Sequence, residues 1–274
     1  MARGHVDFGL KFLNRAFGLE SLHLGLFTDG CPRDMDGLRQ AQAEYTRVLV
    51  SMIPAGVRTI LDVGCGTGVT SKLLKERGYE VEGLSPDLYH REVFPTKCGA
   101  DVPFHLSTFE EFEPHRTFDC LLFSESAQYV DKDAFFPKCL ELTRAGSWIV
   151  ASDFFQIEPG EDYHMCFVER DFVERAGRAG FVVEERKDVT EQVLPSLDIS
   201  LEFLTKYGHP LFELVVDAAA YHAPLLTKLA RAAFRGKFKA LRSLLYDKLP
   251  SRLDRERFRR TMRYSMYRLA RGAA

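Results

Sequence analysis

Residues 60–68 read ILDVGCGTG, an apolar run that reaches Asp62 and then turns through three glycines at alternate positions. A short apolar run that ends in glycines is typical of a buried parallel strand. Residues 69–79, VTSKLLKERGY, predict an amphipathic helix, whose first N–H groups have no partner within the helix. Glycine also lets the backbone pass close to a ligand. The stretch therefore predicts a strand–turn–helix unit that holds a ligand, with Asp62 placed to receive a ligand ammonium group.

The spacing of the glycines separates this turn from the dinucleotide-binding fingerprint. Counted from Gly64 and Gly66, the G-x-G-x-x-G pattern requires a glycine where this chain has Val69. The third glycine, Gly68, comes one residue earlier. In this form the turn resembles motif I of the class I S-adenosylmethionine (SAM)-dependent methyltransferases. The resemblance implies a methyltransferase enzyme with S-adenosyl-L-methionine as its cofactor.

Outside the turn, short apolar runs alternate with helical patterns. Strands are expected within 57–64, 79–84, 103–109, 118–126, 147–155 and 181–190, and helices within 133–146 and 169–180. Such alternation predicts βαβ units and a doubly wound α/β fold. The alternating stretch at 263–271, RYSMYRLAR, predicts a last strand at a sheet edge. The expected fold is a seven-stranded, mostly parallel Rossmann-like sheet of the class I methyltransferase kind, with N-terminal helices and a helical lid before the last strand.

Four regions are expected along the 274 residues. They are an N-terminal helical cap (1–55), a SAM-binding Rossmann-like core (56–195), a helical lid or substrate region (196–258), and the last strand with the tail (259–274). Helices inserted between the sixth and seventh strands would lie over the carboxyl edge of the sheet, where ligands bind in doubly wound folds. We therefore expect this insert to close a substrate pocket.

Three further segments narrow the resemblance. HLGLF at 23–27, SES at 124–126 and DVTEQVLP at 188–195 look like elements of one methyltransferase group. That group contains the tocopherol and sterol C-methyltransferases and small natural-product methyltransferases, and the resemblance covers roughly 20–195. It implies methyl transfer to a small-molecule or lipid-like acceptor, with natural-product or prenyl-type acceptors ranked first.

The end of the expected second strand departs from the usual class I pattern. Most members have an acid there that holds both ribose hydroxyls, whereas this chain has Ser85, with Asp87 two residues later. A hydroxyl cannot form the two charge-assisted hydrogen bonds that a carboxylate forms with the ribose. We nevertheless favour Ser85, because members of this methyltransferase group often have serine at this position. The resemblance assigns Thr108 and Phe109 to the adenine, with core packing as the alternative for Phe109. The expected cofactor-binding residues are Asp62, Gly64, Cys65, Gly66, Gly68, Ser85, Thr108, Phe109 and Ser124.

Methyl transfer from a sulfonium is an in-line displacement that requires a positioned acceptor and exclusion of water. A base is needed only if the acceptor loses a proton, and no metal is expected because no ligand spacing is present. The candidate catalytic residues are Glu125, Tyr129, His23 and His164. Each has a structural alternative: a backbone hydrogen bond for Glu125, packing for Tyr129 and a structural role for either histidine.

Charge is unevenly distributed along the chain. Residues 228–271 contain 15 Lys and Arg and three acidic residues, although the net charge of the whole chain is −2. This basic helical segment favours an anionic substrate group or peripheral contact with an anionic membrane, and a solvated outer face of the lid is the simpler alternative. Nucleic acid is not expected, because the chain is not basic overall. The second functional hypothesis is a non-catalytic SAM-binding or scaffold protein that uses this segment for an anionic partner.

The remaining composition indicates the compartment. The six cysteines have neither paired nor metal-finger spacing, and Cys120 and Cys139 lie in apolar runs typical of a core. No signal peptide is recognisable, and no apolar run approaches the roughly 18 residues that span a bilayer. We therefore expect a cytoplasmic protein with free thiols. The sequence does not specify an oligomeric state.

Overall fold

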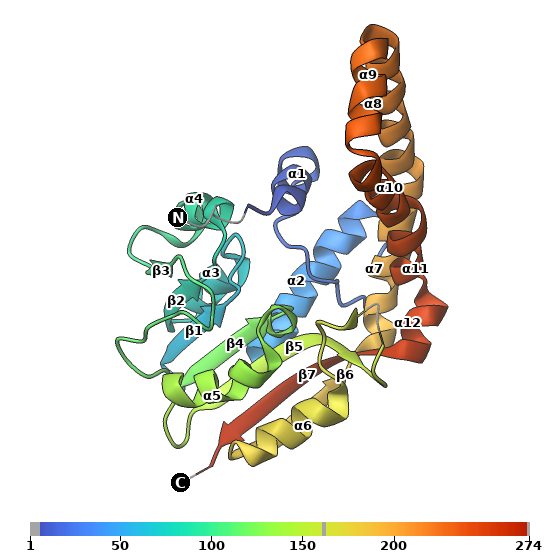
Figure 1. The fold of residues 1–274 in the computed structure, drawn as a ribbon. Helices are drawn as coiled ribbons and strands as arrows, with labels where there is room; N and C mark the ends of the chain where they lie inside the picture. Colours follow the sequence, from blue (N-terminus) through green and yellow to red (C-terminus); the bar gives the residue numbers. More distant parts are fainter. Residues whose placement is uncertain (1–5, 161–162, 273–274) are drawn as a thin grey trace.

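Seven strands form one sheet in the order β3-β2-β1-β4-β5-β7-β6 (Figure 1), in a computed structural model that describes residues 6–160 and 163–272. The strands are β1 Thr59–Val63, β2 Glu80–Leu84, β3 Phe104–His105, β4 Cys120–Ser124, β5 Trp148–Gln156, β6 Phe181–Asp188 and β7 Met262–Arg271. Neighbouring strands are parallel except that β7 runs antiparallel between β5 and β6. The predicted seven-stranded, mostly parallel fold is confirmed.

The order of the strands reverses at β1. From β1 the sheet continues through β2 to β3 on one side and through β4 to β5 on the other. Connections that leave in opposite directions open a crevice at the carboxyl ends of the two central strands. The glycine turn that follows β1 lies at this crevice.

Six α-helices precede the insert in the part of the chain that the structure describes. They are α1 Phe8–Phe17, α2 Met35–Ser51, α3 Val69–Glu76, α4 Leu88–Cys98, α5 Lys132–Leu142 and α6 Glu169–Arg178. Helix α4 is an addition to the predicted elements, because Pro95 within it weakens the helical pattern. Asp87 begins this helix by accepting hydrogen bonds from the backbone N–H groups of Tyr89 and His90.

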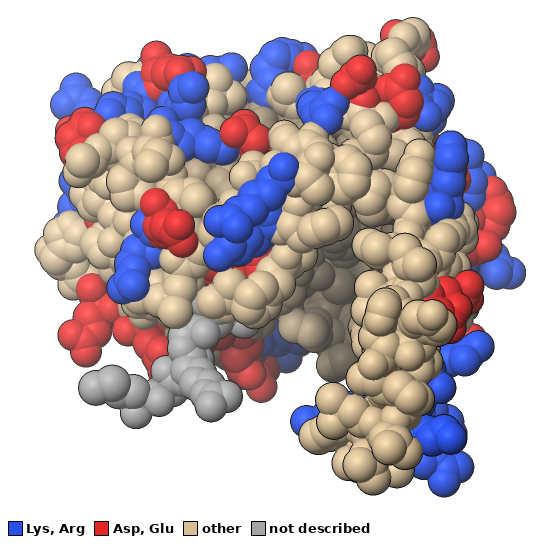
Figure 2. Space-filling view, turned by 90° about the horizontal axis from the view of Figure 1, so that it is seen from above, with Lys and Arg blue, Asp and Glu red and all other residues tan. Residues whose placement is uncertain are grey.

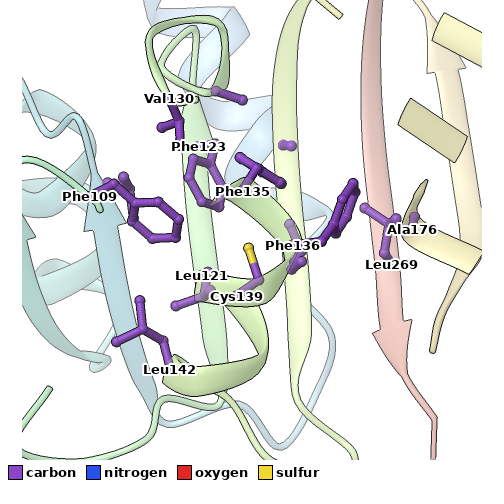
Figure 3. Packing of buried hydrophobic residues seen from close by; sticks show 14 of the residues in the cluster. Phe109, Leu121, Phe123, Val130, Phe135, Phe136, Cys139, Leu142, Ala176 and Leu269 are labelled. Atoms are coloured by element: carbon purple, nitrogen blue, oxygen red, sulfur yellow. The ribbon is translucent and has the colours of Figure 1, made fainter. Parts of the chain in front are cut away.

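Alternate side chains of the central strands enter two separate cores. Leu61 and Phe123 pack on one face with Phe135 of α5, and this core is seen from close by in Figure 3. Ile60 packs on the other face with Tyr45 of α2. All five side chains are buried. Each strand therefore contributes to both faces, and this period of two explains why short, almost wholly apolar runs predicted these strands.

A helical insert connects β6 to β7, as predicted. It comprises α7 Thr190–Phe203, a π-helical turn at Leu204–Gly208, α8 His209–His222, α9 Pro224–Ala233, α10 Arg235–Ser243, a second π-helical turn at Leu244–Lys248, α11 Leu249–Leu253 and α12 Arg255–Thr261. We call residues 204–248 the stalk. It projects beyond the sheet (Figure 1), and none of its residues is buried. Among the helices of residues 6–160 and 163–272, none is long and apolar enough to cross a membrane.

Candidate active site

Close packing leaves no room for a side chain at two of the three glycines of the turn. All three have positive φ angles: +74° at Gly64, +55° at Gly66 and +93° at Gly68. A Cβ atom on Gly64 would lie 2.4 Å from Cβ of Ser126, and one on Gly68 would lie 2.6 Å from Sγ of Cys98. A Cβ on Gly66 would meet no atom within 4 Å. Gly66 is therefore the glycine whose open side faces space for a ligand.

That space is a cavity of about 930 Å³ at the carboxyl edge of the sheet. The cavity is lined by the ends of strands, by the segments that follow four strands, and by the N-terminal segment. The lining residues are 62–67 and 69–70 at β1, 84–87 and 90 at β2, 107–110 after β3, 124–126 and 129–130 at β4, and 6–8, 10 and 20–23 in the N-terminal segment. No residue of 196–258 lines it. The volume is at the upper end of the range for small-molecule sites, roughly 300–1,000 Å³.

The N-terminal segment lines the cavity, and its hydrogen bonds to residues that follow the strands include three to Asp87, Thr67 and Glu125. The backbone N–H of Asp7 donates to Oδ2 of Asp87 at 2.5 Å, and Oγ1 of Thr67 donates to the carbonyl of Glu20 at 2.8 Å. The backbone N–H of Leu24 donates to Oε1 of Glu125 at 2.7 Å. Residues before the first strand thus complete a site that the strand ends begin.

The carboxylate of Asp62 lies beneath the turn. It is 1% exposed, lines the cavity and accepts a hydrogen bond from Oγ of Ser71. Burial raises its pKa to about 6. A buried carboxylate with one short hydrogen bond can accept further bonds from a cationic ligand group, which would restore its charged form.

The structure distinguishes Ser85 from Asp87 at the end of β2. Both oxygens of Asp87 are engaged by backbone N–H groups, those of Tyr89 and His90 at Oδ1 and that of Asp7 at Oδ2. Oγ of Ser85 lies 2.9 Å from Nδ1 of His90 and accepts a hydrogen bond from the backbone N–H of Asp87 at 3.2 Å. All three residues line the cavity. A ligand hydroxyl would therefore meet Ser85 and His90. His90 was not predicted, because a lone histidine after a strand carries no motif.

Glu125 has an unusual backbone conformation and a raised pKa. Its φ angle of +51° is the single positive value at a non-glycine residue in the described part of the chain, a conformation found preferentially at functional sites. Oε1 accepts hydrogen bonds from the N–H of Leu24 and the hydroxyl of Tyr264, while Oε2 makes no hydrogen bond with a described residue. Burial, with a smaller contribution from the carboxyl of Asp153, raises the pKa of Glu125 to about 8.

His23 lines the same cavity with a neutral ring. Its Nδ1 lies 3.0 Å from the carbonyl of Leu24, so Nδ1 carries the proton and Nε2 presents a lone pair. The ring stacks on Tyr45 with a centroid distance of 4.2 Å. Burial lowers the pKa of His23 to about 4. Its Nε2 is buried and has no hydrogen-bond partner among the described residues, which makes it ready to accept a bond from a ligand.

The other predicted residues divide between the cavity and its surroundings. Cys65, Thr108, Ser124 and Tyr129 line the cavity, and Tyr129 is 69% exposed. Phe109 lines it from the core, because it is 4% exposed and meets Phe123 edge-on at 5.3 Å. Gly68 and His164 do not line it. His164 is exposed in the loop after β5, and its carbonyl accepts a bond from Nζ of Lys132.

Tyr264 on β7 is the main addition to the predicted site. It is fully buried and reaches Glu125 from a position 139 residues later in the chain. Nothing in the stretch 263–271 indicates this contact, since a tyrosine in an alternating strand is most simply explained by packing.

A second cluster of titratable groups lies away from the cavity. Glu82, His105 and His115 place their ligand atoms within 4.8 Å of one another. However, Arg116 Nη2 lies 2.6 Å from Oε1 of Glu82, and Nε2 of His105 lies 2.6 Å from Oε2. This carboxylate is already compensated by a guanidinium, so the cluster is explained as a structural ion pair at the edge of the sheet.

Comparison with known proteins agrees with this geometry. Residues 60–146 match the family model described as a methyltransferase domain. The match covers the glycine turn and extends from β1 through α5. It supports the predicted SAM-dependent methyltransferase and its predicted cofactor, S-adenosyl-L-methionine. Over 102 residues the chain is 28% identical to a ubiquinone biosynthesis O-methyltransferase of Bradyrhizobium sp. (strain ORS 278), a match that covers 36% of this chain and 40% of that protein.

Solved structures match over nearly the whole chain. The geranyl diphosphate C-methyltransferase of Streptomyces coelicolor A3(2) superposes with a TM-score of 0.66 at 15% identity, covering 94% of this chain and 92% of that one. The [4+2]-cyclase SpnF superposes with a TM-score of 0.69 at 16% identity, covering 96% and 92%. At these identities the likeness establishes the fold, and the chemistry must be argued from the cavity.

Proposed function

We propose that this protein is an enzyme that transfers the methyl group of SAM to a small-molecule acceptor inside the carboxyl-edge cavity. The observation that carries the proposal is the continuity of this cavity. It extends from the open side of Gly66 to Glu125 and His23, so one space contains both a seat for the cofactor and groups suited to an acceptor.

The cofactor half follows from charge and hydrogen-bonding capacity. The amino-acid end of SAM would lie along the glycine turn, with its ammonium toward Asp62. Its ribose would meet Ser85 and His90, and its adenine would lie beside Thr108 and Phe109. Ammonium binding would favour the charged form of Asp62, whose pKa burial raises to about 6.

The acceptor half follows from Glu125 and His23. The pKa of the Glu125 carboxyl, about 8, is close to neutral pH, and a pKa near the working pH suits a general base. The bonds from Leu24 and Tyr264 hold Oε1 and leave Oε2 to accept a proton from the acceptor. Nε2 of His23 would accept a hydrogen bond and orient the acceptor, since a ring with a pKa near 4 is a weak base.

The reaction would be an in-line displacement at the methyl carbon. The new bond forms from the acceptor atom to the methyl group as the sulfur–carbon bond breaks and its electron pair stays on sulfur. The proton of the acceptor passes to Oε2 of Glu125. The residues of this chain contribute alignment and exclusion of water, and the electrophile is supplied by the cofactor.

We rank lipid-like and prenyl-like acceptors first. The likeness to a geranyl diphosphate C-methyltransferase and to ubiquinone O-methyltransferases supports this class, as do the apolar residues Val6, Phe8 and Leu22 at the cavity. The insert would act as a lid by moving toward the cavity when the acceptor binds.

The test begins with calorimetric titration of SAM into the full chain. The protein is then incubated with SAM and either geranyl diphosphate or a prenylated phenol, and products are analysed by mass spectrometry for an added methyl group. Glu125→Gln is compared with Glu141→Gln, an exposed glutamate of α5 outside the cavity. We expect Glu125→Gln to lower turnover and leave SAM affinity nearly unchanged.

Two results would contradict the proposal. If SAM does not bind, the enzyme and the SAM-binding scaffold hypotheses both fail. If SAM binds but no acceptor of either class is methylated, the non-catalytic alternative gains support. An equal loss of turnover and SAM affinity in Glu125→Gln would assign this residue to cofactor support alone.

A further inference from the structure

The far end of the stalk exposes large apolar side chains. We call residues 221–237 the tip. Tyr221 is 82% exposed, Leu225 76% and Leu229 68%, and Leu226 and Phe234 are also exposed. Monomeric soluble proteins rarely expose apolar side chains in such a group unless it binds something. We therefore expect the tip to bind a partner that removes these side chains from water.

The second half of the stalk, which begins at the tip, is strongly basic. Residues 221–248 contain seven Lys and Arg, namely Lys228, Arg231, Arg235, Lys237, Lys239, Arg242 and Lys248, and one acidic residue, Asp247. No ion pair with a described residue is formed by the cations from Lys228 to Arg242, although three of them lie over the rings of Phe238, Phe234 and Tyr246. The space-filling view shows a face without charged side chains on the projecting part of the molecule, with blue side chains along its border (Figure 2).

A helix with exposed apolar residues beside cations that form no ion pair matches the physics of an interfacial helix. Such a helix lies in the plane of a bilayer, with its apolar side chains among the acyl chains and its cations at anionic headgroups. The helices described are too short or too polar to span a bilayer, so the contact would be peripheral. We propose that the tip docks this protein on an anionic lipid bilayer.

The arrangement of the fold is consistent with this occupant. The stalk and α1 project from the same edge of the sheet, the carboxyl edge that contains the cavity (Figure 1). Phe8 of α1 lines the cavity and is 75% exposed, and Phe12 is 51% exposed. A bilayer in contact with the tip would thus face the side on which an acceptor enters.

Charge favours a bilayer over a second copy of the tip. Two tips packed symmetrically would bring the same cations of each copy together, whereas anionic headgroups compensate them. The proposal is independent of methyl transfer, and lipid binding is measured in the absence of SAM and acceptor. Its failure can therefore be distinguished from failure of the proposed function.

The experiment is co-sedimentation of the full chain with vesicles. Vesicles of phosphatidylcholine alone are compared with vesicles that also contain phosphatidylglycerol. We expect binding to the anionic vesicles, weakened by added salt, and little binding to the neutral ones. The double substitution Leu225→Gln and Leu229→Gln should weaken binding about tenfold or more, because two apolar side chains no longer enter the bilayer. Lys228→Glu with Arg231→Glu should abolish the preference for anionic vesicles.

Val182→Gln is the matched control, since Val182 on β6 is 56% exposed and lies outside the stalk. It should bind vesicles like the unchanged protein. Equal binding to neutral and anionic vesicles, or unchanged binding by the double glutamine variant, would overturn the proposal. So would a concentration-dependent oligomer in analytical ultracentrifugation that the glutamine substitutions dissociate, without vesicle binding, because a second copy would then cover the tip.

Discussion

The sheet and the stalk both contain rows of aromatic and aliphatic side chains, but they place them in opposite environments. Phe135 and Phe172 are completely buried against the sheet, whereas Leu225 and Leu229 of the stalk are 76% and 68% exposed. In the sheet, apolar burial stabilises the strand ends that carry the cavity. In the stalk the same kind of residue is left for an external contact. Stability and binding are therefore assigned to different regions, and substitutions can separate them.

The largest expected effect is on the free energy of unfolding after Phe135→Ala. This ring meets Phe123 at 4.8 Å, Phe136 at 4.9 Å and Phe167 at 5.6 Å, so its loss leaves a cavity in a filled core. We expect destabilisation by about 4 kcal/mol in urea denaturation. Val182→Ala, on an exposed site, should change the same quantity by less than about 0.5 kcal/mol. A loss near 1 kcal/mol for Phe135→Ala would mean that this core is loosely packed.

A second prediction sharpens the contrast within the turn itself. Gly66→Val should weaken SAM binding about 100-fold or more, or about 2.7 kcal/mol, because the added side chain enters the cavity. Gly146→Val is the control: Gly146 has a φ of +81° and open surroundings like those of Gly66, but lies outside the cavity. Both variants should lose about 1–2 kcal/mol of stability to backbone strain. Calorimetry should find the loss of affinity in Gly66→Val alone. Equal SAM affinities would refute the placement of the cofactor.

The glycine turn and the sheet could be predicted because their signals are local. A strand buried on both faces must be apolar throughout, and a turn that passes a ligand needs glycine, so residues 60–68 indicate both structure and cofactor. Glu125 was also predictable, because it follows a strand whose carboxyl end must lie at the crevice. Its raised pKa was not, since that results from burial and, to a smaller extent, from the carboxyl of Asp153, and both depend on how distant segments of the chain pack around Glu125.

For the stalk, the sequence predicts the helices but not what their apolar faces contact. An amphipathic pattern is the same whether its apolar face packs on the protein, on a second copy or on a bilayer. The helices of 196–258 were therefore predictable, while the exposure of Leu225 and Leu229 became visible only in three dimensions. Whether the insert closes over the cavity remains a prediction, because in this structure none of its residues lines the cavity.

A third prediction concerns pH and the acidic groups of the cavity. The folded-state pKa of Glu125, about 8, lies above the ordinary value near 4.5, so between these values the folded protein holds a proton that the unfolded chain has lost. Stability should therefore fall as the pH rises through this window. Glu125→Gln removes the contribution, because a glutamine oxygen can accept the same two bonds without charge. The unchanged protein should lose about 1–2 kcal/mol of stability between about pH 6 and about pH 8, and the variant should lack this loss.

The rate provides an independent check on Glu125. If its ionised form accepts the acceptor's proton, turnover should rise with pH through about 8 and level off above it. The Glu125→Gln variant should lack this limb of the pH profile. A variant whose stability has the same pH dependence as the unchanged protein would show that Glu125 is ionised throughout and that its surroundings are more polar than its burial implies.

The smallest expected effect is the most informative about the stalk. Leu229→Ala should change the free energy of unfolding by less than about 0.5 kcal/mol, because the side chain is 68% exposed and leaves no cavity. Urea denaturation at low protein concentration, without lipid, SAM or acceptor, measures this directly. A loss of about 2–5 kcal/mol, as for a buried leucine, would mean that the stalk is covered in solution. If that loss were concentration-dependent, a second copy would be the cover. If it were not, the insert would fold back over the cavity and act as the predicted lid before any acceptor binds.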